Sequence, residues 1–342
     1  MKSEEIKIPV AIIGASGYTG LELLKLLITH PVFDIKYIGN TKGGIKVQEL
    51  HPCLQGVFSG DVLKSDAKEI AKVAKIAFLA LPHKASMGFA KELLKLGVKI
   101  VDLSADYRLE LDTYEKYYCK HEDKDNIQNA VYGLPEFYRD KIKNSSLVAN
   151  PGCYPTATLL GILPFCDFID ENYPIFIDAK SGVSGAGKKC TAKTHFVSID
   201  ENIFAYNPLS HRHEPEIKEK IRHYSGKDFD INFVPHLLPI IRGEMIDSYM
   251  LLKEEGLEPL SVLKTFYKDE PNIRIYEHPV DMKSPSGTNF CDIFAKVVGK
   301  KLYINSAIDN ILRGSSSQAV TNANIMFNLD ENLGIPTISY VP

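Results

Sequence analysis

The stretch KIPVAIIGASGYTGLELLKLLITH, residues 7–30, decides the fold. Its first part, residues 7–13, is an apolar run that is too short for a stable helix, and Gly14 interrupts that run. Leucines then recur at helical spacing over residues 21–30. The stretch therefore predicts a strand that turns sharply into a helix.

The alternation of strand and helix continues through the first third of the chain. Further strands are expected at residues 34–39, 75–81 and 98–103, with a helix at residues 85–96. Strands that are separated by helices pair in parallel, through right-handed crossovers. The sequence thus predicts an α/β fold that begins with a Rossmann-like, doubly wound domain.

The pattern changes after about residue 150, where strand-like runs become longer and alternate in polarity. Such alternation favours an α+β domain with a mostly antiparallel sheet. Residues 315–328 can form a helix that returns to the first domain. Because 342 residues exceed a usual single core, we expect one domain at 1–150 plus 312–342 and a second at 151–311.

Composition excludes several classes of partner. A net charge of −3 with 24% charged residues gives no reason to expect nucleic acid or an anionic membrane, so a small-molecule partner is expected. No stretch approaches 18 apolar residues and no signal-peptide pattern is present, which favours a cytoplasmic protein. The six cysteines form no C-x-x-C pair, so neither a metal site nor a disulfide framework is expected.

A glycine-rich loop lies where the first strand meets its helix. Glycines at G-x-x-G-x-x-G spacing let a backbone approach a pyrophosphate, and the helix N-terminus supplies N–H groups. The alternative is a tight turn without a ligand. The candidate dinucleotide-binding residues are Gly14, Ala15, Ser16, Gly17, Tyr18, Thr19 and Gly20.

The end of the second strand bears on the type of cofactor. Proteins that bind NAD usually place an acidic residue there, on the ribose 2′-hydroxyl. This chain has Asn40, Thr41 and Lys42 instead. The missing carboxylate and the nearby lysine favour NADP, although an ordinary solvated loop is the alternative for Lys42.

Cys153 is the candidate nucleophile. The segment NPGCYPT, residues 150–156, follows a short strand and precedes an apolar helical stretch, so Cys153 is expected close to a helix N-terminus. The helix dipole there stabilises a thiolate and lowers the thiol pKa. The other five cysteines lack this setting and are expected to be structural. A nucleotide-binding fold with such a cysteine indicates redox chemistry at the aldehyde level.

These motifs together resemble the N-acetyl-gamma-glutamyl-phosphate reductase family. The resemblance rests on GASGYTG (14–20), VDLSADYRL (101–109), YGLPE (132–136), NPGCYPT (150–156), SGVSGAGK (181–188), HRHEPEI (211–217), PHLLPIIRG (235–243) and DNILRGSSSQAVTNAN (309–324). It implies NADPH-dependent conversion of N-acetyl-gamma-glutamyl phosphate to the semialdehyde and inorganic phosphate, through a thioester on Cys153, in arginine biosynthesis. It also implies a homodimer or homotetramer.

Two histidines are candidates for the acid or base. His211 and His213 flank Arg212, and Pro215 marks the start of a helix. In an extended segment, residues two apart face the same side, and histidine works as a base near neutral pH. The resemblance implies that this pair serves Cys153. His211 is the favoured candidate, the choice stays open, and a surface pair that caps a helix is the alternative.

The implied substrate carries a phosphate and a carboxylate, which guanidinium groups bind bidentately. The candidates Arg108, Arg212 and Arg242 lie inside the matched motifs, and a structural ion pair is the alternative for each. In the glycine-serine loop we expect Ser181 at the substrate and Ser184 and Gly185 at the cofactor. The remaining histidines considered, with structural or surface roles, are His51, His83, His195 and His236.

Two rival functions remain to be compared. Aspartate-semialdehyde dehydrogenases share the fold and the cysteine chemistry, but the HRHEPEI segment (211–217) argues against them. A non-catalytic NADP-binding sensor would be expected to lack the cysteine or the histidine pair, and the chain has both.

Overall fold

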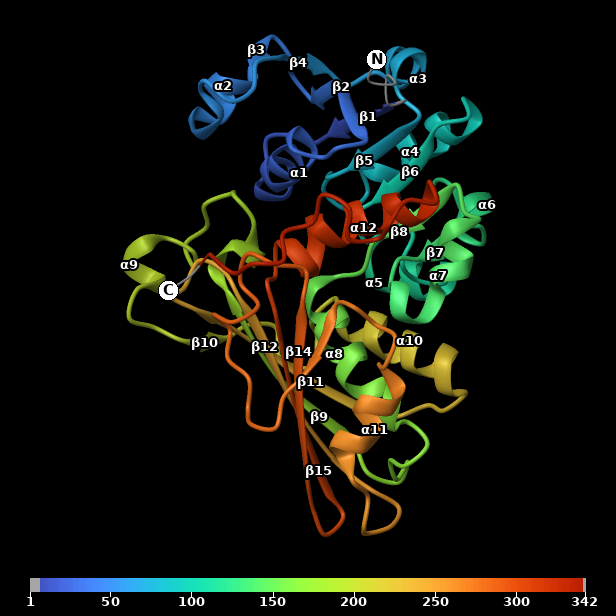
Figure 1. Cartoon of the computed structure of the whole chain (residues 1–342), viewed down its shortest axis with the longest axis vertical. Helices are drawn as coiled ribbons and strands as arrows, with labels where there is room; N and C mark the ends of the chain where they lie inside the picture. Colours follow the sequence, from blue (N-terminus) through green and yellow to red (C-terminus); the bar gives the residue numbers. More distant parts are fainter. Residues whose placement is uncertain (1–6, 341–342) are drawn as a thin grey trace, which may run out of the picture. The chain divides into compact units, whose positions relative to one another are not determined.

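The computed structural model describes residues 7–340, which form two compact units (Figure 1). Unit 1 comprises Met1–Pro151 and Ser315–Ile335, and unit 2 comprises Gly152–Gly314 and Pro336–Pro342. Residues 1–6 and 341–342, which the expected domain boundaries include, lie outside the described residues. Over the described range, no helix is long and apolar enough to cross a membrane.

Unit 1 is a doubly wound α/β domain. Its described strands form one sheet in the order β3-β4-β2-β1-β5-β6-β8-β7, and every neighbouring pair among them is parallel except β3 with β4. The strands are β1 (Ile8–Ile13), β2 (Phe33–Asn40), β3 (Ile45–Lys46), β4 (Asp61–Lys64), β5 (Ile76–Leu79), β6 (Lys99–Asp102), β7 (Val131–Tyr132) and β8 (Leu147–Ala149). The helices are α1 (Tyr18–Ile28), α2 (Val47–Leu50), α3 (Ala67–Val73), α4 (Ser86–Lys95), α5 (Leu111–Tyr117), α6 (Lys124–Ile127), α7 (Pro135–Lys143) and α12 (Ser317–Met326). The predicted Rossmann-like class is confirmed.

The turn after β1 requires glycine. Gly14 has φ +91°, and a Cβ built on it would lie 2.1 Å from the Ala80 carbonyl oxygen. β1 is buried over its last four residues, as expected for a central parallel strand that is covered on both faces. This combination places the loop that follows β1 at the carboxyl edge of the sheet, which is where doubly wound folds bind nucleotides.

The last helix belongs to unit 1, whereas the tail that follows it belongs to unit 2. The helix expected over residues 315–328 is α12, which packs against α1, α7 and β6 of unit 1. The tail after Ile335 belongs with unit 2, whereas the sequence grouped residues 312–342 with the first domain. The Ser339 hydroxyl donates to the Ser286 carbonyl at 2.8 Å, and the Tyr340 ring packs on Gly287.

Unit 2 is built on a mixed, mostly antiparallel sheet. Within its described residues the strand order is β10-β11-β9-β12-β15-β14-β13, with parallel pairing only for β9 with β11 and β13 with β14. The strands are β9 (Ile175–Gly182), β10 (Phe204–Ala205), β11 (Ile231–Leu238), β12 (Glu244–Leu251), β13 (Ile273–Ile275), β14 (Cys291–Val298) and β15 (Lys301–Ile308). The helices are α8 (Cys153–Ile162), α9 (Phe196–Ile199), α10 (Glu214–Ser225) and α11 (Pro259–Phe266).

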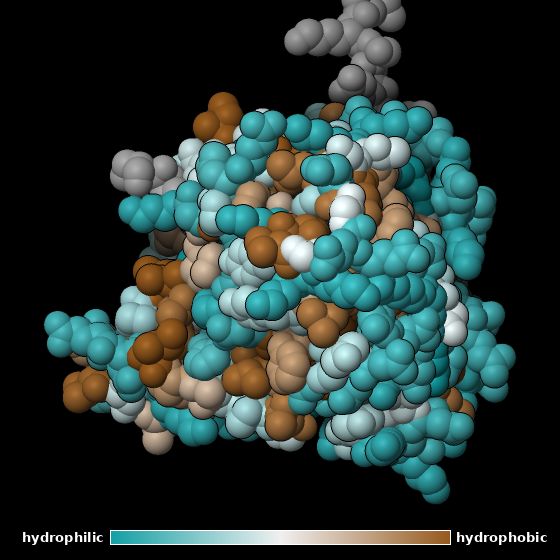
Figure 2. All heavy atoms as spheres, turned by 90° about the horizontal axis from the view of Figure 1, so that it is seen from below, coloured by the Kyte–Doolittle hydropathy of each residue, from teal (hydrophilic) through white to brown (hydrophobic). Residues whose placement is uncertain are grey.

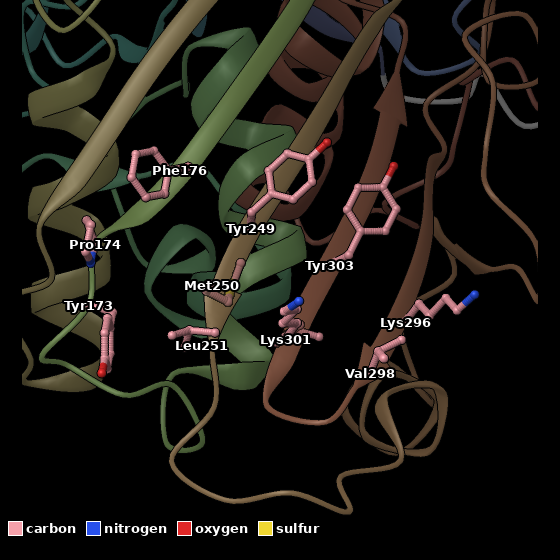
Figure 3. A pocket seen from close by; sticks show the side chains of 11 residues that line it. Tyr173, Pro174, Phe176, Tyr249, Met250, Leu251, Lys296, Val298, Lys301 and Tyr303 are labelled. Atoms are coloured by element: carbon pink, nitrogen blue, oxygen red, sulfur yellow. The ribbon is translucent and has the colours of Figure 1, made fainter.

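The two faces of this second sheet differ. The face turned toward α8 is buried, whereas the opposite face carries a row of aromatic side chains from three adjacent strands (Figure 3). Phe176 is the register partner of Tyr249, which in turn is the partner of Tyr303. Seen from the lower end of Figure 1, hydrophobic side chains gather in clusters among hydrophilic ones (Figure 2). We call the row Phe176, Tyr249 and Tyr303 the aromatic row.

Candidate active site

Cys153 is the first residue of α8, directly after the turn that leaves unit 1. Gly152 is the N-cap residue, and its carbonyl oxygen accepts both the N–H and the hydroxyl of Thr156, at 3.0 and 2.9 Å. The rest of α8 is buried, while Cys153 is partly exposed. The thiol is thus accessible at a helix N-terminus, the position that favours a thiolate.

Two further residues fix this turn. The Glu216 carboxylate, only 1% exposed, accepts the Gly152 N–H at 3.0 Å, so α10 is tied to the turn. Gly314 packs directly against Cys153, because a Cβ on Gly314 would lie 2.6 Å from the Cys153 Cβ. Both contacts restrict the position of the sulfur.

His211 and His213 lie together beside the residue that follows Cys153. Their ring centroids are 4.9 Å apart, and each ring meets the Tyr154 ring edge-on, at 5.7 Å for His211 and 5.8 Å for His213. His213 is the N-cap of α10, and Pro215 lies in its first turn, which confirms the predicted loop-to-helix transition. The structure therefore brings both candidate histidines to the residue that follows Cys153.

His211 is held in its neutral form. Burial, with a smaller contribution from Arg212, lowers the pKa of His211 from 6.5 to about 4. Its Nδ1 accepts the backbone N–H of His213 at 3.2 Å, which places the hydrogen of the neutral ring on Nε2. His211 can therefore donate a hydrogen bond from its Nε2–H to a developing oxyanion.

A tyrosine pair completes this cluster. The Tyr206 hydroxyl donates to the Tyr154 hydroxyl at 3.0 Å, and Tyr154 reaches the His236 carbonyl at 3.4 Å. Burial raises the pKa of both phenols well above 10, and the neighbouring acidic groups Cys153 and Glu244 act in the same direction. Both tyrosines are therefore neutral donors at physiological pH.

The three candidate arginines have different environments. Arg108, in unit 1, is buried and donates to the backbone carbonyls of Asn150 and Leu103 at 2.7 and 2.8 Å. Arg242 pairs with the fully buried Asp309 at 3.5 Å, and Arg212 is exposed between the two histidines. Arg108 thus holds its own unit together, whereas Arg212 and Arg242 belong to the unit that contains Cys153.

The glycine-serine loop follows β9. The Ser181 side chain is buried and donates to the Gly182 carbonyl at 3.1 Å, and the Ser184 hydroxyl accepts the Asn310 amide at 2.9 Å. Gly185 is exposed and packs close to the Ser181 hydroxyl. The two serines shape the loop, and the exposed backbone of Gly185 is the part that can approach a ligand.

The loop after β1 fits a pyrophosphate. α1 begins at Tyr18 with Gly17 as N-cap, so its first N–H groups face the loop rather than a preceding helical turn. A Cβ on Gly17 would meet only the Gly14 carbonyl, at 3.9 Å, which leaves the mouth of the loop open. Tyr18 is 41% exposed, and the Thr19 hydroxyl contacts that of Ser315 at 3.4 Å.

Asn40 joins this loop to the end of β2. Its amide donates to the Ser16 hydroxyl at 3.2 Å, and its oxygen accepts the N–H groups of Lys42 and Gly43. Lys64 is the register partner of Asn40, so two exposed lysines, Lys42 and Lys64, lie on segments that meet here. This edge of the sheet is suited to a phosphate.

Two family models match the chain over most of its length. Residues 9–145 match the NAD binding domain of semialdehyde dehydrogenases, and residues 153–310 match the semialdehyde dehydrogenase dimerisation domain. These matches support a nicotinamide cofactor for unit 1.

Curated relatives define the family more narrowly. An N-acetyl-gamma-glutamyl-phosphate reductase from a Sulfurovum species is 57% identical, with 98% of this chain and all of the relative covered. Enzymes of the same name from Wolinella succinogenes and Aquifex aeolicus are 56% and 42% identical, over 98% and 97% of this chain and 99% and 98% of the relatives. The chain belongs to the N-acetyl-gamma-glutamyl-phosphate reductase family.

Solved structures show the fold that this reductase family shares with other enzymes. The aspartate semialdehyde dehydrogenase II from Vibrio cholerae has a TM-score of 0.72 at 15% identity, covering 94% of this chain and 98% of that one. The Candida albicans enzyme with NADP has a TM-score of 0.70 at 13% identity, covering 96% and 99%. At such identities the likeness concerns the fold alone.

Sequence reasoning missed three residues that the structure places around the N-acetyl-gamma-glutamyl-phosphate reductase motifs. Glu216 lies inside the quoted HRHEPEI motif (211–217), but only the folded chain shows its bond to Gly152. Gly314 and Glu244 reach Cys153 through the fold. No local pattern signals these contacts, because each spans a long stretch of chain.

Proposed function

We propose that the protein reduces N-acetyl-gamma-glutamyl phosphate to N-acetyl-glutamate semialdehyde with NADPH, in arginine biosynthesis. The observation that carries this proposal is the placement of Cys153. A partly exposed thiol stands at a helix N-terminus, and the next residue, Tyr154, contacts two histidines, in a chain 57% identical to a reductase of this name. Aspartate semialdehyde dehydrogenase, the alternative, is supported only by fold neighbours at 15% identity.

The proposed first step is attack of the Cys153 thiolate on the acyl carbon. The new C–S bond replaces the bond between that carbon and the phosphate oxygen, so inorganic phosphate leaves and a thioester remains. First-turn N–H groups of α8 face the developing oxyanion. The Glu216 bond to Gly152 keeps this turn in place during the reaction.

The second step reduces the thioester. When bound, the nicotinamide cofactor supplies the hydride for the thioester carbonyl. The neutral His211 donates a hydrogen bond from its Nε2–H to the resulting oxyanion, and this oxyanion then reforms the carbonyl as the C–S bond breaks, which releases the aldehyde and the Cys153 thiolate. His213, fixed as the N-cap of α10, orients His211 or the substrate.

Arginines are proposed to recognise the charged ends of the substrate. Arg212 and Arg242 belong to the same unit as Cys153 and are assigned to the phosphate and carboxylate groups, in either order. Ser181, at the end of β9, is assigned to the acyl group. Arg108 is assigned an indirect role in substrate binding, through its hydrogen bond to the Asn150 carbonyl.

NADP is the proposed form of the cofactor. No acidic residue stands at Asn40, Thr41 or Lys42, and the Asp66 carboxylate nearby is engaged as the cap of α3. Lys42 and Lys64 would favour the 2′-phosphate. Unit 1 is accordingly assigned to the cofactor, and unit 2 to the catalytic chemistry and to oligomerisation.

The test is a comparison of two aldehydes in the reverse direction. Phosphate-dependent reduction of NADP is measured with N-acetyl-glutamate semialdehyde and with aspartate semialdehyde at equal concentrations. The proposal expects kcat/KM to favour the N-acetylated substrate by at least about a hundredfold, because buried polar recognition groups discriminate strongly. A preference for aspartate semialdehyde, or turnover that ignores phosphate, would contradict it.

A homodimer is the proposed assembly, with the aromatic row as its contact. Phe176 and Tyr249 are 53% and 47% exposed on a sheet face that none of the described helices of unit 2 covers, and the matched family model is called a dimerisation domain. Beyond the row, Lys180 pairs with Asp178 and Asp247 at 2.6 and 2.7 Å. An apolar patch bordered by charge is typical of a contact between subunits.

The assembly is tested by sedimentation. Tyr249→Glu is expected to dissociate the dimer into monomers at micromolar concentration, and a tetramer of such dimers would lose at least half of its mass. Tyr224→Glu, at a 42% exposed tyrosine on α10, serves as the matched control and is expected to stay dimeric. A Tyr249→Glu protein of unchanged mass would place the interface elsewhere.

The cytoplasm is the proposed location. The six cysteines are free thiols, and Cys153 must stay reduced to act as a nucleophile. Fractionation of the native host, with an antibody against the chain, tests this assignment.

A further inference from the structure

A buried acid lies beneath the proposed nucleophile. Glu244 begins β12 and is 0% exposed, on the face that α8 covers. Its register partner on β15 is Ile308, whose Cδ1 would lie 3.3 Å from a Cβ on Gly314. The same Cβ would lie 2.6 Å from that of Cys153, so these residues form one packed layer.

The carboxyl group of Glu244 has an unusual environment. Across residues 7–340, neither of its oxygens has a hydrogen bond of regular geometry, and both are buried. Within that range, the hydrogen-bonding group that acts on the pKa of the carboxyl is the Cys153 thiol. Glu244 is therefore a polar side chain whose available partner is the reacting sulfur.

The charges around Glu244 keep its proton in place. Burial, the largest effect, and the negative charge of Asp309 raise the pKa of Glu244 from 4.5 to about 8, and the Cys153 contact works against them. The titratable groups that act on this layer are Cys153 from α8, Asp309 after β15, Tyr154, and Tyr206 after β10. Arg242, a cation of the same unit, pairs with Asp309 instead.

When one of two adjacent acidic groups is fully buried, both cannot carry a negative charge without a large cost, so an acid and a thiol in contact share one proton between them. The helix N-terminus favours the charge on sulfur. We propose that Glu244 is a further catalytic residue, held protonated beneath Cys153 so that its O–H donates to the thiolate before attack and again when the thiolate leaves. This inference rests on Cys153 being the nucleophile of the proposed function.

The proton of Glu244 is not consumed in this scheme. When the C–S bond forms, sulfur loses its charge and the carboxyl loses its strong acceptor. When the C–S bond of the thiohemiacetal breaks, the thiolate returns and the O–H donates to it again. Glu244 thus lowers the free energy of the thiolate at both ends of the cycle, without moving a proton to the substrate.

Infrared spectroscopy tests the protonation state directly. The wild-type protein at pH 7 is expected to show the carbonyl stretch of a protonated carboxyl, which Glu244→Gln removes and the exposed control Glu254→Gln keeps. Alkylation of Cys153 with iodoacetamide should shift that band, because the anionic acceptor is gone. A wild-type spectrum without the band, or a band that ignores alkylation, would overturn the proposal.

The rate of Cys153 alkylation against pH tests the donor role. Glu244→Leu, which has no donor, should slow alkylation at pH 6–7 by about ten- to a hundredfold, as expected for losing a hydrogen bond to a charged group. Glu244→Gln keeps an N–H donor and should stay within about threefold of the wild type.

Other outcomes of the alkylation experiment contradict the donor role in distinct ways. If Glu244→Gln and Glu244→Leu slow the alkylation of Cys153 equally, Glu244 would be ionised and would act as a base, because neither replacement can accept the thiol proton. Equal acceleration would mean an ionised neighbour that repels the thiolate, and no change in either would mean a structural role alone. None of these measurements needs turnover, so their failure is separable from failure of the proposed reductase activity.

Discussion

Replacing Glu244 by glutamine should change how the stability of the protein depends on pH. The folded chain raises the pKa of Glu244 from 4.5 to about 8, so between these values the folded state holds a proton that the unfolded state has released. Raising the pH through this window therefore favours unfolding. The amide of the Glu244→Gln variant does not titrate, so the variant should lose this dependence.

The expected magnitude follows from the size of the shift. Retaining this proton lowers the free energy of unfolding of the wild type by under about 1 kcal/mol at pH 5 and by about 3 kcal/mol at pH 7. The stability of Glu244→Gln relative to the wild type should thus rise by about 2–3 kcal/mol over that interval. A pH-independent effect of the buried amide on the free energy of unfolding is the same at pH 5 and pH 7, so it cancels when the two pH values are compared.

The assay is urea unfolding at pH 5, 6, 7 and 8, followed by circular dichroism because the chain has no tryptophan. Glu254→Gln, which removes an exposed carboxylate from the same unit, is the matched control and should follow the wild type. A difference between Glu244→Gln and the wild type that stays constant from pH 5 to 8 would refute a buried, protonated Glu244.

Three further predictions concern the proposed catalytic and cofactor residues. His211→Asn should lower kcat by about 10²–10⁴-fold with a smaller effect on KM, whereas His213→Asn should act mainly on KM, and a reversed pattern in steady-state kinetics would exchange the two roles. Gly314→Ala should lower kcat at least about tenfold and lower the free energy of unfolding by about 1–3 kcal/mol in the same urea assay, because its Cβ would lie 2.6 Å from the Cys153 Cβ. Wild-type turnover in this variant would show that the sulfur tolerates displacement. Lys42→Ala and Lys64→Ala should each raise the KM for NADPH and leave the KM for NADH unchanged, and equal effects on both cofactors would remove the lysines from the 2′-phosphate.

Local patterns were sufficient for the fold class of unit 1 and for its first elements. The run at residues 7–13, Gly14 and the leucines of α1 predict a strand, a turn and a helix from adjacent residues, and β1 and α1 follow that order. The helix of the HRHEPEI segment (211–217) was likewise readable from Pro215. Such features depend on propensity and capping, which act within a few residues.

Tertiary contacts were beyond such reasoning. Glu244, Gly314 and Glu216 come from β12, the turn after β15 and α10, and they meet Cys153 or its turn only when unit 2 folds. In the sequence alone, Glu244 cannot be told from an ordinary exposed polar residue, because nothing local indicates that it is buried. Lys64 was missed for the same reason, since its pairing with Asn40 joins β4 to β2.

The central claim, a thioester on Cys153, is tested most directly by trapping that intermediate. The enzyme is mixed with N-acetyl-glutamate semialdehyde and NADP without phosphate, quenched in acid and digested for mass spectrometry. A burst of one NADPH per active site is expected, together with an N-acetylglutamyl adduct on the peptide that contains Cys153, and neither is expected in Cys153→Ser. A full burst without the adduct, or an adduct on the exposed Cys53 or Cys190 instead, would contradict the claim.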